Sequence, residues 1–87
     1  MHIELHEQAI VDFEFWKKSG NKAILKKIEQ LLFAIQEKPF AGIGKPEQLK
    51  YQLSGQWSRR INDEHRIIYD IVDGILHIYS LRGHYKY

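Results

Sequence analysis

The 87-residue chain is 44% hydrophobic and 28% charged, as expected for a globular domain with a single modest core. It has no cysteine, which excludes disulfides and a thiol nucleophile, and no run of about 18 apolar residues that could span a membrane. Its first residues carry acids and lack the basic start of a signal peptide. We therefore expect one cytoplasmic domain over residues 1–87, with no membrane partner.

The net charge of +2 is unevenly placed along the chain. Residues 1–38 balance six lysines with six acids, whereas residues 39–87 hold seven lysines or arginines against five acids. Clustered cations suit a polyanionic partner such as RNA, because Lys and Arg make most phosphate contacts. A solvated basic surface would show the same pattern, so charge alone does not establish RNA binding.

The first half of the chain predicts a strand and two helices. Residues 1–5 alternate apolar and polar side chains, as a short strand does. From Glu7 to Lys18, apolar residues recur at helical spacing: Ile10, Phe13 and Trp16. After a turn at 19–21, a second helix has one broad apolar face, made of Ile24, Leu25, Ile28, Leu31, Leu32 and Ile35. Pro39 should end it, because proline disfavours helical geometry in the residue before it.

The second half predicts a loop followed by strands. Glycines and Pro46 indicate a loop over 40–50 that fits neither a phosphate-binding loop nor a dinucleotide-binding motif. Strands are expected over 51–54, 57–61, 66–72 and 75–82, with a tight hairpin at Asp73-Gly74. The order of elements predicts an α+β fold. An N-terminal strand and a two-helix hairpin should pack on a mainly antiparallel sheet of about four to five strands.

A metal site is the first candidate for chemistry. His2, Glu4 and His6 alternate, so on a strand they would share one face. A stable site needs a third or fourth fixed ligand and supporting hydrogen bonds, and the sequence indicates no source for them. We therefore expect no metal and no cofactor.

The second half also contains the residue types that cleave RNA without a metal. Glu47 lies in the loop, Arg66 opens a strand and His84 follows the last strand. Cleavage needs a base for the 2′-hydroxyl proton, an acid for the leaving 5′-oxygen and cations for the charge at phosphorus. As structural alternatives, Glu47 could be a solvated loop acid and His84 part of a frayed tail. Arg66 could pair with Asp70 or Glu64.

Strand register leaves one choice open. In a hairpin between residues 57–61 and 66–72, a shift of one residue exchanges Arg59 for Arg60 on the face that carries Arg66. The sequence does not fix this register, so both arginines stay candidates.

Several ordered segments resemble one known family. They are Gly42-Ile-Gly-Lys-Pro-Glu-Gln-Leu-Lys50, Leu53-Ser-Gly-Gln-Trp-Ser-Arg-Arg-Ile61, Glu64-His-Arg-Ile-Ile-Tyr69 and His84-Tyr85. Together with the two-helix first half, they are similar to the Txe/YoeB family of addiction-module toxins over essentially the whole chain. The resemblance implies a RelE-like fold and a metal-independent endoribonuclease. Such a toxin cleaves mRNA in the ribosomal A site by attack of the 2′-oxygen and so inhibits translation.

The resemblance also implies roles for individual residues. Glu47 matches the family's general base, His84 its general acid and Arg66 the arginine that stabilises the transition state. Supporting contacts with RNA are expected from further residues of the second half: Lys45, Lys50, Arg59, Arg60 and Tyr85.

Two features beyond this match stay open. Lys86 and Tyr87 extend the chain past the histidine–tyrosine pair that usually ends it, and their role is not indicated. Trp57 could stack on a base or belong to the core.

As partners, the resemblance implies the bacterial ribosome with mRNA, a cognate antitoxin of the YefM/Axe kind, and a homodimer in some members. Operator DNA would be bound only through the antitoxin complex, since no helix here is markedly basic on one face. The alternatives are a module that binds RNA or the ribosome without cutting, and one that only docks an antitoxin. Codon preference and the strictness of ribosome dependence are not specified by the sequence.

Overall fold

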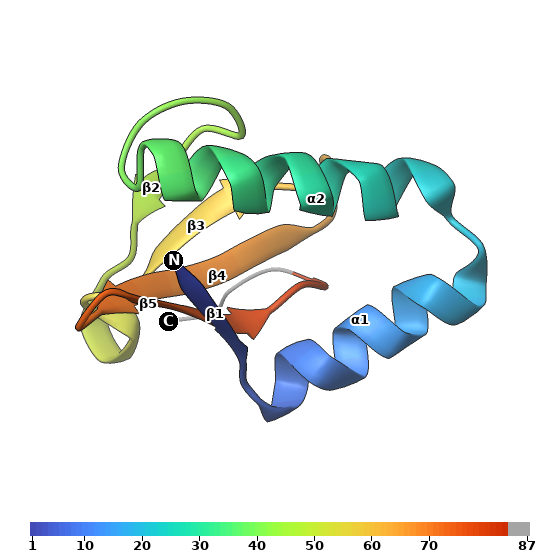
Figure 1. Cartoon of the computed structure of the whole chain (residues 1–87), viewed down its shortest axis with the longest axis horizontal. Coiled ribbons are helices and arrows are strands. Elements are labelled where there is room, and N and C mark those ends of the chain that lie inside the picture. Colours follow the sequence, from blue (N-terminus) through green and yellow to red (C-terminus); the bar gives the residue numbers. More distant parts are fainter. Residues whose placement is uncertain (84–87) are drawn as a thin grey trace.

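A computed structural model of the chain describes residues 1–83, in which two helices pack against one five-stranded sheet (Figure 1). The helices and strands are β1 (His2–Leu5), α1 (Glu7–Ser19), α2 (Lys22–Glu37), β2 (Glu47–Gln48), β3 (Trp57–Arg60), β4 (Arg66–Val72) and β5 (Ile75–Ser80). The strand order is β1-β5-β4-β3-β2, with β1 parallel to β5 and all other pairs antiparallel. This architecture confirms the predicted α+β fold.

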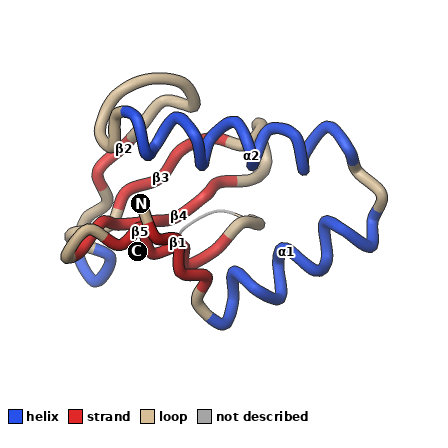
Figure 2. Tube along the Cα trace, in the orientation of Figure 1, coloured by secondary structure: helices blue, strands red, loops and turns tan. Residues whose placement is uncertain are grey.

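Local sequence explains how the two helices are joined, and Figure 2 shows the short loop between them. Gly20 ends α1 in the left-handed conformation, at φ 71°. Asn21 caps α2, because its side-chain oxygen accepts a hydrogen bond from the backbone N–H of Ile24 at 3.1 Å. α2 ends at Glu37, two residues before Pro39, as predicted. No helix among residues 1–83 is long and apolar enough to cross a membrane.

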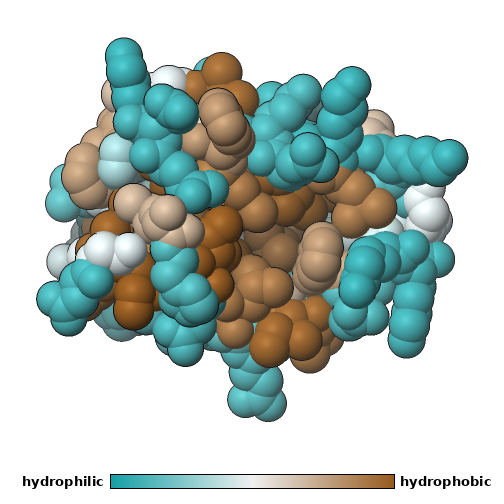
Figure 3. All heavy atoms as spheres, viewed as in Figure 1, coloured by the Kyte–Doolittle hydropathy of each residue, from teal (hydrophilic) through white to brown (hydrophobic). Residues whose placement is uncertain are grey.

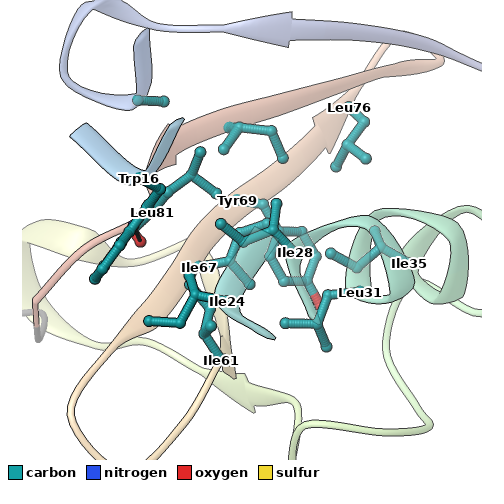
Figure 4. Close-up of a cluster of buried hydrophobic side chains, with 12 residues drawn as sticks. Trp16, Ile24, Ile28, Leu31, Ile35, Ile61, Ile67, Tyr69, Leu76 and Leu81 are labelled. Atoms are coloured by element: carbon teal, nitrogen blue, oxygen red, sulfur yellow. Dashed lines mark hydrogen bonds between the residues drawn. The ribbon is translucent and has the colours of Figure 1, made fainter. Parts of the chain in front are cut away.

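The core lies between the helices and one face of the sheet (Figure 4). It is made of the buried residues Ala9, Trp16, Ile24, Ile28, Leu31, Ile35, Ile61, Ile67, Tyr69, Leu76, Ile78 and Leu81. On α1 the predicted apolar stripe is only partly correct, because Ile10 is 50% exposed whereas Asp12 is buried. The buried Asp12 carboxylate is satisfied by hydrogen bonds that it accepts from Gln8 and from the backbone N–H of Leu81.

The strand predictions hold for the central hairpin and fail for one segment. Asp73 and Gly74 both have positive φ, at 52° and 75°, as the tight turn between β4 and β5 requires. The strand predicted over 51–54 is wrong, because Tyr51–Leu53 form a 3₁₀ turn closed by the hydrogen bond from the Leu53 N–H to the Lys50 carbonyl. The strand that pairs with β3 lies instead within the predicted loop, at Glu47–Gln48.

An apolar hollow of about 220 Å³ opens between the helices and β1 (Figure 3). Its lining is entirely hydrophobic: Ile3, Leu5, Phe13, Ile28, Leu32 and Leu81. The helical layer therefore leaves part of its apolar surface accessible.

Candidate functional site

The sheet face that points away from the helices carries three of the predicted site residues. Glu47 on β2 lies directly opposite Ser58 on β3, and Arg60 on β3 lies directly opposite Arg66 on β4. Directly paired residues share a face of a sheet, and so do residues two apart on one strand. Glu47, Arg60 and Arg66 therefore share one face, which we call the open face.

The register that the sequence left open is thereby decided in favour of Arg60. Arg60 pairs with Arg66, whereas Arg59 pairs with the fully buried Ile67 and points into the core. Arg60 is exposed and Arg59 is 0% exposed. The two neighbouring arginines thus have opposite environments.

The buried Arg59 guanidinium serves the fold. Its Nε donates to the Tyr69 hydroxyl at 3.2 Å, and its two terminal nitrogens donate to the backbone carbonyls of Lys38, Ala41 and Ile43. Burial raises the pKa of Tyr69, and the guanidinium partly offsets this effect. Arg59 ties the loop after α2 to the sheet. We therefore remove it from the residues expected to contact RNA.

The Arg66 guanidinium lies over the turn that precedes β4. It donates to the backbone carbonyl of Asn62 at 2.9 Å and to that of His65 at 3.2 Å. Among residues 1–83 it forms no ion pair with Asp70 or Glu64, the acids considered as structural partners. Neither of these carboxylates thus neutralises the positive charge of Arg66 on the open face.

Two predicted lysines flank Glu47 along the chain. Lys45 lies two residues before it and Lys50 three residues after it, and both side chains are exposed. Gly44 holds this segment close to the sheet, because its carbonyl accepts a hydrogen bond from the Arg60 N–H at 2.6 Å. β2 and the adjoining loop therefore present one carboxylate between two exposed cations.

His84 and Tyr85 lie outside the described residues, but the chain that leads to them is anchored at two points. The first is Leu81, which is held by α1. Its backbone N–H donates to Asp12 at 2.9 Å, and its carbonyl accepts from the Trp16 indole at 2.9 Å.

The second anchor is Gly83, which is held at the start of β4. The Arg66 N–H donates to the Gly83 carbonyl at 3.0 Å, and the Gly83 N–H donates to Nδ1 of His65 at 2.9 Å. The His65 ring itself packs edge-on against Trp16, with the ring centroids 4.8 Å apart. No role for His65 could be predicted from the sequence, because its hydrogen-bond partner lies 18 residues away.

Trp57 lies on the helix side of the sheet. It pairs with the buried Tyr69, is half-buried against the core, and has the Phe40 ring at 4.8 Å. Its position favours the core alternative over base stacking on the open face.

The opposite edge of the open face gathers a different group of side chains. Glu4, His6 and His77 place their ligand atoms within 4.8 Å of one another. Beside them, Tyr79 donates to the Asp70 carboxylate at 2.9 Å, and burial together with this carboxylate raises the pKa of Tyr79 to about 12. This cluster lies at the β1–β5 edge, whereas Glu47 lies on β2 at the other edge.

Sequence comparison relates the chain to a family of toxins. The family model for the YoeB-like toxin of bacterial type II toxin–antitoxin systems matches residues 5–85. Toxin YoeB of Synechocystis sp. is 55% identical over 86 residues, which cover 99% of this chain and 99% of that protein. Toxin YoeB of Escherichia coli K12 is 46% identical over 85 residues, which cover 98% of this chain and 100% of that protein.

Solved structures show the same likeness. The YoeB/ParE toxin from Agrobacterium tumefaciens matches with a TM-score of 0.93 and 37% identity, over 98% of this chain and 100% of that one. YoeB of Staphylococcus aureus, solved in complex with YefM, matches with a TM-score of 0.88 and 42% identity over 98% of each chain. The S. aureus YoeB dimer gives a TM-score of 0.89 and 41% identity over 98% of each chain. These matches confirm the predicted RelE-like fold.

Proposed function

Because the chain belongs to the YoeB-like toxin family of type II toxin–antitoxin systems, we propose that it is an endoribonuclease that cleaves mRNA in the ribosomal A site. Such cleavage inhibits translation. The observation that carries the proposal is the shared open face of Glu47, Arg60 and Arg66, since it groups a carboxylate with two cations.

The reaction begins at the ribose. The Glu47 carboxylate takes the proton of a 2′-hydroxyl, and the 2′-oxygen attacks the adjacent phosphorus. The bond to the 5′-oxygen breaks, and His84 protonates that leaving oxygen. The products are a 2′,3′-cyclic phosphate and a 5′-hydroxyl end.

Arg66 supplies the positive charge that the transition state needs. Negative charge grows on the phosphoryl oxygens during attack, and a fixed cation there lowers the barrier. Glu47 on β2 and Arg66 on β4 are separated by one intervening strand, which places the strand axes about 10 Å apart. This spacing leaves room for a ribose and its phosphate between the base and the cation.

The remaining predicted residues hold the RNA. Lys45, Lys50 and Arg60 contact neighbouring phosphates, and Tyr85 stacks on a base or positions His84. The anchoring of Leu81 and Gly83 supports this scheme, because it fixes the chain beside Arg66 immediately before His84.

The proposed partners follow from the same family. The S. aureus relative is seen with YefM and as a dimer, so we expect this chain to bind a YefM-like antitoxin and to form a homodimer. Operator DNA is then bound through the antitoxin. Because the proposed target is the ribosome, we expect the toxin in the cytoplasm. We also expect residues 1–87 to form one domain.

The test is primer extension on a defined mRNA in purified bacterial ribosomes. Wild type should give a stop in the A site, and Glu47→Gln and His84→Gln should each weaken it by about 10²–10⁴-fold. Glu29→Gln, which changes an exposed acid on α2, is the matched control and should keep full cleavage. If wild type binds ribosomes without cutting, the chain is the non-catalytic binding module instead. If both variants cut normally, the chain is a nuclease whose acid and base are not Glu47 and His84.

A further inference from the structure

Three potential metal ligands meet at the β1–β5 edge of the open face. Glu4 on β1 lies directly beside His77 on β5 in the parallel register. His6 follows β1, and its backbone N–H donates to the Ile78 carbonyl at 2.9 Å, which brings its ring to the same place. The His6 Nε2 and His77 Nδ1 atoms are 2.9 Å apart, and Oε2 of Glu4 is 3.5 Å from the same Nδ1.

We propose that Glu4, His6 and His77 bind a divalent transition-metal ion, with Zn²⁺ as the probe. Tetrahedral zinc has bonds of about 2.0–2.1 Å to nitrogen and oxygen, so its ligand atoms lie about 3.3 Å apart. The His6–His77 and Glu4–His77 separations of 2.9 and 3.5 Å lie on either side of that value. All three ligand atoms lie within 4.8 Å of one another, so the exposed Glu4 side chain must move toward the two imidazoles for all three to contact one ion.

The donor set determines which ions fit. Two imidazole nitrogens and one carboxylate oxygen suit zinc and its neighbours in the transition series, with water in the fourth position. Mg²⁺ and Ca²⁺ prefer sites made of oxygen ligands. The site should therefore select Zn²⁺ over Mg²⁺.

The ring of Tyr79 lies beside both imidazoles and helps to hold them in place. The Tyr79 ring lies 4.5 Å from the His6 ring and 6.3 Å from the His77 ring, centroid to centroid. Tyr79 is itself fixed by its hydrogen bonds to both carboxylate oxygens of Asp70, at 2.9 Å each. His6 and His77 are half-buried while Glu4 is exposed, so the ligands are ordered and one side of the site is accessible.

The proposed site differs from the candidate set His2, Glu4 and His6 that the sequence suggested. His2 lies outside the cluster, and the third ligand that the N-terminal segment lacks comes from His77, far along the chain. The bound ion would bridge β1 to β5 and stabilise the edge strand. β1 and β2 lie at opposite edges of the sheet, about 19 Å apart, so the ion would be remote from Glu47.

The proposal is tested by isothermal titration of the tag-free full chain with Zn²⁺. We expect one ion per chain, and a loss of affinity of at least about 10–100-fold in His77→Gln and in Glu4→Gln. His2→Gln, which changes a described histidine outside the cluster, should bind as wild type does, and Mg²⁺ should not bind. Binding that survives His77→Gln, or that disappears in His2→Gln, would overturn the proposal.

A second measurement does not depend on how well the variants fold. NMR of the histidine ring nitrogens in the wild-type chain should show Zn²⁺-dependent shifts at His6 and His77 and none at His2. Zn²⁺ should also raise the melting temperature of the wild-type chain. Unshifted His6 and His77 nitrogens would mean that the two rings simply share a hydrogen bond.

Discussion

Replacing Arg59 by methionine tests whether this arginine serves the fold or the RNA. Methionine keeps a flexible side chain and removes the guanidinium, which donates four hydrogen bonds within the protein. A hydrogen bond from a charged group contributes about 1.5–3 kcal/mol. Three of the four acceptors are backbone carbonyls of exposed residues in the segment after α2, and removing the charge also removes its desolvation penalty. We therefore expect the free energy of unfolding to fall by about 3–5 kcal/mol.

The assay is urea denaturation followed by tryptophan fluorescence, with Arg60→Met as the matched control. Arg60 is exposed, so its replacement should change the free energy of unfolding by less than about 0.5 kcal/mol. It should instead reduce ribosomal cleavage by about 10-fold, as expected for a lost contact of about 1.4 kcal/mol. Equal stability of the two variants would refute the assignment of Arg59 to the fold, and so would full stability of Arg59→Met.

Three further predictions concern other parts of the molecule. Gly44→Ala should destabilise the fold by about 1–3 kcal/mol in thermal denaturation, because an added Cβ would lie 2.9 Å from a leucine methyl of α2, at φ +83°. His65→Phe keeps a ring at this position but removes the acceptor for the Gly83 N–H, and should slow single-turnover cleavage by about 10-fold. Stability should fall as the pH rises from 10 to 12, because the folded protein raises the pKa of Tyr79 from 10.0 to about 12 while the unfolded chain deprotonates first.

Each of these has its own control. Gly20→Ala meets no atom within 4 Å, so it should cost less than Gly44→Ala, and equal costs would contradict the steric argument. His65→Phe should melt within a few degrees of wild type; unchanged cleavage in a folded variant would remove the positioning role. Tyr79→Phe should lose stability less steeply above pH 10, and an identical pH profile would show that another group titrates.

The sequence predicts those parts of the fold that local rules determine. The turn at 19–21, the second helix and the Asp73-Gly74 hairpin each depend on residues close together in the chain, and all three are correct. The segment 51–54 was misassigned because four residues are too few to separate a strand from a 3₁₀ turn.

The site is less accessible to sequence reasoning because it depends on long-range pairing. Which of Arg59 and Arg60 faces the core is set by the register with β4, and one residue of slip would exchange them. The contact between His65 and Gly83 and the meeting of His77 with Glu4 likewise join segments far apart in sequence. The residue types of the proposed nuclease could be identified from the sequence. That Glu47, Arg60 and Arg66 share one face could be established only from the strand pairing.

The most direct test of the central claim is cleavage of a ribosome-bound mRNA that carries a single 2′-deoxynucleotide at the cut position. Our account predicts normal binding and no cleavage at that position, because the attacking 2′-oxygen is missing. The matched all-ribose message should be cut to a 2′,3′-cyclic phosphate and a 5′-hydroxyl end. Continued cleavage of the deoxy-substituted message would contradict the account, since the nucleophile would then have to be water.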